Sequence, residues 1–352
     1  MKIRFTHLAV AALSCVAAGG AHADDSFGQT VRDLADKGIT LRANLINQYA
    51  ENTRGGVDQG HTNVGQFNIG ADIDLEKTLG WNGSSFHFTV YRDYGNGLNH
   101  DVTGTFTKQQ YIYKNEFPAW HMGLFAWEQK LLDDKLDILV GRLGTTSYYA
   151  HLATNCQFQA GTTCGVPRIV NSEAGFSLLP SATWGLNIRY KPTEHTYIET
   201  GAYEVNPTTS ASNGLDWSIR DATGTTIPIE WGWVRNDPKK DPYGFEVKVG
   251  GYVSTAPLTD IQFNTADRSR GRFGGTARPS GAERKGVYAM ADKVVWRPDR
   301  DSPRNLNVFG GIVQQLEEQE IMRQQIYGGF VFNGPFAQRP QDTVGFSASY
   351  FN

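Results

Sequence analysis

The stretch FNIGADIDL, residues 67–75, has two faces of opposite character. Side chains alternate along an extended strand. One side therefore carries the apolar residues Phe67, Ile69, Ala71, Ile73 and Leu75, and the other carries Asn68, Gly70, Asp72 and Asp74. An apolar face normally contacts a core, while a polar face contacts water. The same alternation recurs along the chain, which predicts an all-β protein.

Thirteen segments read as strands by this alternation. They are 39–50, 64–76, 84–94, 122–131, 135–143, 182–191, 195–204, 226–235, 243–254, 286–297, 304–315, 324–332 and 342–351. These segments are 9–13 residues long, close to the roughly 9–11 residues that a tilted strand needs to cross a bilayer. Strands of soluble proteins are usually about five or six residues long. The apolar faces are therefore expected to contact lipid, and the polar faces a wet lumen. The alternative is a soluble β-sandwich or lectin-like barrel with these faces in its core.

The connections between these segments alternate between long and short. The first ten contain 13, 7, 27, 3, 38, 3, 21, 7, 31 and 6 residues. An up-and-down antiparallel sheet with its long loops at one end gives this pattern. Outer-membrane β-barrels have the same asymmetry, with short periplasmic turns and long external loops. The pattern predicts a transmembrane β-barrel.

The N-terminus has the features of a cleaved secretory signal. Lys2 and Arg4 precede an apolar region, and Ala21-His22-Ala23 forms a small-x-small cleavage site. Residues 1–23 are therefore expected to be a signal peptide for export to the outer membrane of a Gram-negative cell. Residues 24–38 hold an amphipathic segment, expected to be a periplasmic helix that braces the barrel rim or simply leads into the first strand. Residues 39–352 form the barrel.

Charge and cysteine content exclude several classes of function. Without Lys2 and Arg4, 31 of the 33 basic residues remain against 36 acidic ones, so nothing indicates a nucleic-acid partner. Only Cys156 and Cys164 remain after signal cleavage. A disulfide forms readily in an exported protein, and these two residues are expected to be bonded. The sequence contains no constellation typical of an enzyme, so no catalytic residue, metal or cofactor is expected.

Four segments carry a resemblance to a known family. They are GADIDLEKTLGWNGSSFHF (70–88), WEQKLLDDKLDILVGRL (127–143), YGFEVKVGGYVSTAPLTD (243–260) and GGFVFNGPFAQRPQDTVGFSASY (328–350). In this order they resemble the carbohydrate-selective porins, the porin B family. The resemblance extends over nearly all of the mature chain and implies a 16-stranded channel for mono- and small oligosaccharides. The N-terminal segment departs from the family, because it lacks a Trp-Gly-Gly before the helix.

A sugar channel needs hydrogen-bonding groups along its path, none so strong that it traps the solute. Polar residues in the inward phase are therefore candidates for lining the pore or binding sugar. They are Arg42, Asn44, Asp72, Asp74, His87, Tyr91, Asp93, Glu128, Lys130, Arg189, Glu199, Tyr203, Glu246 and Lys248. Any one of them could instead line a wide wet wall and pair with a neighbour.

Two loops are candidates for further roles. Loop 144–181 is the longest and holds Tyr148, Tyr149, His151, Arg168 and the cysteine pair. A 16-stranded barrel is too wide to select a monosaccharide, so this loop is expected to fold inward and narrow it. The cysteines would stiffen it there, or else protect an exposed loop tip. In loop 255–285, Arg268, Arg270 and Arg272 could face the pore mouth, water, or lipopolysaccharide phosphates.

The strand count raises a question about the end of the chain. Single-chain bacterial barrels have an even number of strands, but thirteen is odd. The resemblance implies about three further strands, so the chain is expected to be C-terminally truncated, with a gap between its first and last strands. Two other functions stay open: a general diffusion porin without sugar preference, and a secreted carbohydrate-binding β-protein. The sequence does not distinguish a monomer from a homotrimer.

Overall fold

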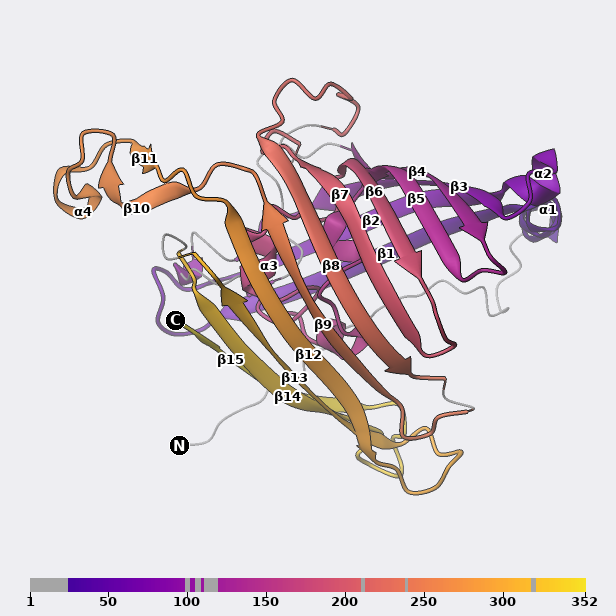
Figure 1. Ribbon diagram of the computed structural model, residues 1–352. Helices are drawn as coiled ribbons and strands as arrows, with labels where there is room; N and C mark the ends of the chain where they lie inside the picture. The colour runs from indigo at the N-terminus through magenta and orange to yellow at the C-terminus, as the bar shows by residue number, and fades with distance from the viewer. Residues whose placement is uncertain are drawn as a thin grey trace.

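The computed structural model describes residues 25–98, 102–104, 109–110, 120–209, 213–237, 240–317 and 321–352; the expected signal peptide, 1–23, lies outside these ranges. Its main element is a 13-stranded antiparallel sheet in which each strand pairs with its neighbours in the chain (Figure 1). The strands are β1 (Ile39–Asn52), β2 (Gly60–Asp74), β3 (Ser84–Tyr94), β4 (Trp120–Leu131), β5 (Leu136–Leu143), β6 (Thr183–Tyr190), β7 (Thr196–Val205), β8 (Gly224–Arg235), β9 (Phe245–Ser254), β12 (Arg284–Trp296), β13 (Asn305–Gln315), β14 (Gln324–Asn333) and β15 (Thr343–Phe351). All thirteen predicted strands are confirmed, with ends shifted by a few residues.

The sheet curves strongly, so that β1 and β2 lie behind β8 and β9 in Figure 1. The strand order begins with β1 and ends with β15, and the described residues of these two strands do not pair with each other. The expected gap between the first and last strands is therefore present in the sheet. A closed barrel is not formed by the described residues, and the count of 16 strands stays a prediction.

The two faces of the sheet differ as the alternation predicted. On β8, Ile227, Ile229 and Trp231 are 51%, 57% and 40% exposed, whereas Glu230 between them is fully buried. The same contrast holds on β9, where Val249 and Val253 are exposed while Glu246 and Lys248 are buried. The convex face is thus an apolar surface, and the polar side chains point into the curve.

Short helices lie at the ends of strands and within loops. They are α1 (Asp25–Asp36), α2 (Leu75–Leu79), α3 (Arg168–Glu173), α4 (Arg270–Phe273) and the 3-10 helices η2 (Thr145–Ser147) and η3 (Ala153–Gln157). Helix α1 ends at Asp36, and Gly38 closes the turn after it, with a φ of 89° that suits glycine and an N–H that donates to Ala35 O at 2.9 Å. Among the described residues, no helix is long and apolar enough to cross a bilayer.

Two details differ from the sequence prediction. The strand expected over 64–76 ends at Asp74, because the Asp74 carboxylate caps α2 by accepting a hydrogen bond of 3.0 Å from Lys77 N–H. In the loop after β9, the short strands β10 (Thr259–Asn264) and β11 (Ala277–Pro279) form a separate hairpin that projects beyond the sheet (Figure 1). The end of β2 is therefore set by the helix cap at Asp74 and not by the alternation of apolar and polar residues.

Replacing Ile229 by Lys tests whether the convex face contacts lipid. Ile229 lies in the middle of β8 and is 57% exposed. A charge at the bilayer midplane costs about 2–4 kcal/mol in a transmembrane β-barrel, so Ile229→Lys should lower stability by that amount in lipid vesicles, as measured by denaturant titration. Ile229→Leu is the control and should be neutral. Equal stability of the two variants would contradict a lipid-facing surface.

Candidate functional site

The β5–β6 loop, residues 144–182, packs against the concave face of the sheet. Its backbone N–H groups donate to side chains of distant strands: Ala150 to Glu230 on β8, Ala153 to Glu246 on β9, and Ile169 to Gln325 on β14. Thr154 Oγ1 also donates to the Asp292 carboxylate on β12, at 2.7 Å. These contacts confirm that the loop folds inward. The sequence could not identify these partners of the loop, because the loop itself has no hydrophobic periodicity.

Glu230 is the most heavily bonded of these anchors. Its fully buried carboxylate accepts three hydrogen bonds: from Ala150 N–H at 2.8 Å, Tyr197 OH at 2.6 Å and Tyr288 OH at 2.8 Å. A buried carboxylate is tolerated only when it is bonded in this way. The loop and two strands are therefore joined at one group. Sequence reasoning did not select Glu230, although a carboxylate between the outward-facing Ile229 and Trp231 was a usable signal.

A second anchor lies two strands away from Glu230, around Asn187 on β6. Asn187 Oδ1 accepts hydrogen bonds from Tyr149 OH of the loop and Tyr203 OH of β7, both at 2.7 Å. Its amide donates to Glu199, which also forms an ion pair of 2.5 Å with Arg189. The predicted lumen residues Arg189, Glu199 and Tyr203 thus come together, and they support the loop.

The predicted pair Glu246 and Lys248 forms a third anchor on β9. The two side chains are 3.2 Å apart, and Lys248 Nζ donates to the backbone carbonyl of His151 at 2.5 Å. Burial, aided by the nearby Lys248 charge, lowers the pKa of His151 to about 4, so this loop histidine is neutral at physiological pH. The wall from β6 to β14 therefore holds the loop in place.

The wall from β1 to β4 is more open and carries a row of charges. Arg42 pairs with Asp72 at 2.7 Å, Asp72 contacts His87 at 2.6 Å, His87 contacts Glu128 at 3.3 Å, and Glu128 pairs with Lys130 at 3.6 Å. The side chains of Arg42 and Lys130 are 45% and 43% exposed. Five predicted lumen residues therefore form one continuous, partly exposed ladder.

The remaining candidates lie around this ladder. Asn44 is the register partner of Asn68 on β2, and the Tyr91 ring packs over Gly123. Asp74 caps α2, so its carboxylate is engaged at the end of the strand. Asp93 accepts a hydrogen bond of 2.9 Å from Gln66, toward the other end of the same wall.

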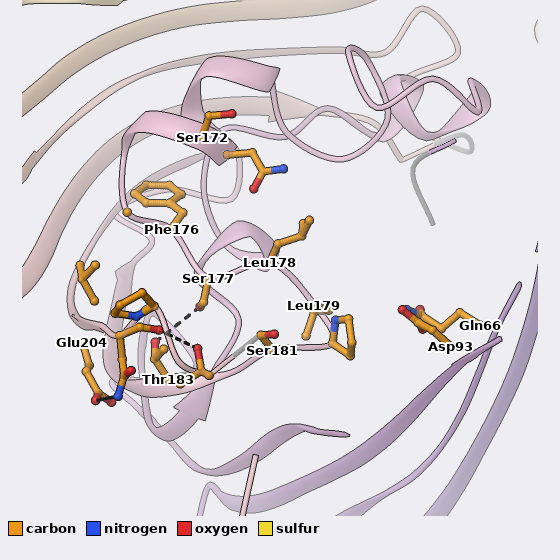
Figure 2. A pocket seen from close by; sticks show the side chains of 17 residues that line it. Gln66, Asp93, Ser172, Phe176, Ser177, Leu178, Leu179, Ser181, Thr183 and Glu204 are labelled. Carbon is orange, nitrogen blue, oxygen red and sulfur yellow. Dashed lines mark hydrogen bonds between the residues drawn. The ribbon is translucent and has the colours of Figure 1, made fainter. Parts of the chain in front are cut away.

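A cavity of about 280 Å³ lies between this wall and the β5–β6 loop. Gln66 and Asp93 line it from the wall, and loop residues between Asn171 and Thr183 line it together with the segment around Glu204. Figure 2 shows Gln66 and Asp93 across an opening from Leu179 and the rest of the loop. The lining mixes hydroxyl, amide and carboxyl side chains with apolar ones such as Phe176, Leu178 and Leu179. Within the described ranges, no group of three or more His, Cys, Asp or Glu residues could hold a metal ion.

Cys156 and Cys164 lie close together within the loop but are not bonded in the structure. Their sulfur atoms are 3.4 Å apart, whereas a disulfide bond is about 2.05 Å long. The hydrogen bond from Cys164 and another from Gly165 N–H lower the pKa of Cys156 to about 6. The pair is therefore positioned for oxidation, and the disulfide stays a prediction.

A long-stranded antiparallel sheet with an apolar convex face and a loop folded into its curve defines a porin-type membrane channel protein. The sequence profile of the carbohydrate-selective porin, OprB family, matches residues 58–352, and the chain belongs to that family. It is 28% identical to Porin B of Pseudomonas aeruginosa over 323 residues, which are 89% of this chain and 70% of that protein. It is 25% identical to the putative porin QuiX of Acinetobacter baylyi, over 92% of this chain and 73% of that protein.

Solved structures agree with this assignment. The high-pH structure of Pseudomonas putida OprB superposes with a TM-score of 0.84 at 25% identity, covering 93% of this chain and 78% of that one. The low-pH structure of the same protein gives a TM-score of 0.58 at 19% identity, covering 94% and 82% of the two chains. The resemblance predicted from the sequence is confirmed.

Removing the Glu230 carboxylate should loosen the loop. Glu230→Ala leaves three donors without their acceptor, at about 1–3 kcal/mol for each buried group that stays unpaired. We expect lower thermal stability and a larger, noisier single-channel conductance. Glu283→Ala removes an exposed carboxylate, paired with Lys285 at 3.1 Å, and is the control. Unchanged conductance and stability in Glu230→Ala would show that the anchor does not hold the loop.

The cysteine pair is tested by counting thiols. In unreduced, denatured mature protein, Cys156 and Cys164 should titrate as no free thiols, and a count of two would contradict the disulfide. After reduction and refolding, alkylation of Cys156 should rise with pH through about 6, because the reactive thiolate dominates above the pKa. Cys156→Ser is the control and should abolish this phase. A rise only near pH 8.5, the usual range of a free thiol, would contradict the lowered pKa.

Proposed function

We propose that this chain forms a passive outer-membrane channel for mono- and small oligosaccharides, with no cofactor and no enzymatic activity. The observation that carries the proposal is the cavity bounded on one side by the open β1–β4 wall and on the other by the anchored loop. Membership of the carbohydrate-selective porin family and the names of the relatives support it. The rival function is a general diffusion porin without sugar preference.

In this proposal, sugars move between the loop and the charge ladder from Arg42 to Lys130. Each sugar hydroxyl exchanges hydrogen bonds with water for hydrogen bonds with the wall, so binding along the path is favourable but weak. The ion pairs balance charge along the ladder, and their partly exposed side chains leave lone pairs and N–H groups available. Selectivity then depends on the width that the loop sets, and movement follows the concentration gradient.

The proposal includes a closed barrel of the 16-stranded porin type. In hydrocarbon, unpaired backbone N–H and C=O groups at the edges of β1 and β15 would each cost several kcal/mol. Closure would therefore need strands beyond the thirteen of this sheet. We further propose a cleaved signal over residues 1–23, a periplasmic position for the N-terminal helix, and a monomer or homotrimer.

A contact with lipopolysaccharide is part of the same proposal. Among the described residues, Arg268, Arg270 and Arg272 of the β10–β11 hairpin form no ion pair, whereas Arg278 beside them pairs with both Asp260 and Asp267 at 2.6 and 2.7 Å. Guanidinium groups bind phosphate well. The hairpin projects beyond the strand ends that carry the long loops, where the phosphates of the outer leaflet would lie (Figure 1).

Liposome swelling tests the function directly. Proteoliposomes should swell faster in glucose than in an amino acid of similar size, and glucose should partly block ion conductance in a planar bilayer. Deleting residues 153–164, at the centre of the loop, should raise conductance and reduce the preference for sugar. Equal permeation of sugars and amino acids by the intact protein would favour the general diffusion porin.

A further inference from the structure

We infer that Asp93 makes the cavity beside the loop electronegative, so that the channel favours neutral and amino sugars over anionic sugars such as uronates. This inference rests on the proposed function, because it concerns the same sugar path. It goes further by specifying the charge of the solute. Membership of a carbohydrate-selective family leaves that charge open.

The charged groups around the cavity are few. Asp93 and Glu204 are the charged residues among those that line it, and the described lining contains no Lys, Arg or His. The two carboxylates differ in their surroundings. Glu204 lies 3.7 Å from the guanidinium of Arg142, which is fully buried behind it. The charge of Glu204 is therefore largely compensated within the protein.

Asp93 has no such compensation among the described residues. Its hydrogen-bond partner is the neutral amide of Gln66, at 2.9 Å. The next residue in sequence, Arg92, lies on the opposite face of β3, with its guanidinium 5.8 Å from the centre of the Trp120 ring. Arg42 on the neighbouring part of the wall is engaged by Asp72 at 2.7 Å and by Thr89 at 3.3 Å. The negative charge of Asp93 therefore interacts with any solute in the cavity.

The position of Asp93 strengthens its effect on a solute. The side chain is largely buried, so water screens its charge less than it would at an exposed surface. A charge that lines a cavity with low-dielectric walls also focuses its field into that cavity. Gln66 donates to one carboxylate oxygen, which leaves the other oxygen and the Gln66 carbonyl as acceptors. Sugar hydroxyls can donate to these acceptors and an ammonium group is attracted, whereas a carboxylate or phosphate is repelled.

The experiment compares swelling rates in glucose, glucosamine and glucuronate for proteoliposomes of the full chain at low salt. The intact protein should admit glucosamine and glucose faster than glucuronate. Asp93→Asn removes the charge at nearly constant volume and should raise the ratio of glucuronate to glucose rates about threefold, an order-of-magnitude expectation for one poorly screened charge. The change should shrink in 1 M salt, where screening extends only about 3 Å.

Two further variants make the test decisive. Gln66→Lys places an ammonium group beside Asp93, which compensates the carboxylate charge, and should also raise the ratio. Asp134→Asn removes a carboxylate from the β4–β5 turn, outside the cavity, and should leave the ratio unchanged; Asn tolerates the positive φ of 62° at this position. A ratio that is the same in the intact protein, Asp93→Asn and Gln66→Lys would overturn the inference. Failure of the intact protein to admit glucose would instead overturn the proposed function.

Discussion

The structure depends on one constraint, which is the pairing of backbone hydrogen bonds in a medium without water. In the hydrocarbon of a bilayer, each unpaired N–H or C=O costs several kcal/mol, so a spanning sheet must pair every strand with a neighbour. The β1–β2 register satisfies this over the whole length of β1, from Ile39 opposite Ile73 to Asn52 opposite Gly60. Because the backbone groups are paired within the sheet, the two faces of the sheet differ only in their side chains.

That division allows an unusual number of charges on the concave face. Burying a carboxylate is costly unless hydrogen bonds or a counter-ion compensate it. The loop supplies some of these partners through its backbone, as Ala150 does for Glu230 and Ala153 does for Glu246. The strand carboxylates hold the loop, and the loop in turn stabilises the buried carboxylates. The two halves of the wall thereby differ: one anchors the loop, and the other carries a partly exposed charge ladder.

The β1–β4 wall carries ion pairs that are suited to weak, reversible contacts with a solute. The Arg42–Asp72 and Glu128–Lys130 pairs are partly exposed, where the net gain from an ion pair is small. Their hydrogen-bonding groups therefore exchange easily between water and a passing solute. By contrast, the Arg189–Glu199 pair has a carboxylate only 1% exposed and belongs to the loop support. Burial, rather than residue type, separates the groups that face the solute from those that hold the structure.

The strands were predictable from the sequence because period-2 alternation depends only on local geometry. The errors also have local causes: Leu75 continues the apolar phase of β2, although the Asp74 cap turns the chain into α2, and β10 and β11 are too short to show a pattern. Alternation also placed the residues of the ladder from Arg42 to Lys130 on one face, where they form contacts with one another.

The function of each lumen residue could be decided only by the tertiary structure. The groups that hold the loop meet partners far away in the chain, as Ala150 meets Glu230 and Thr154 meets Asp292. Which strand residues the loop contacts depends on the conformation of the loop. The loop has no hydrophobic periodicity from which that conformation could be predicted. The sequence by itself therefore determined the sheet and its two faces, since both follow from repeating local geometry. The positions of the groups that hold the loop were decided by the tertiary structure, because one irregular segment packs against β6, β8, β9, β12 and β14.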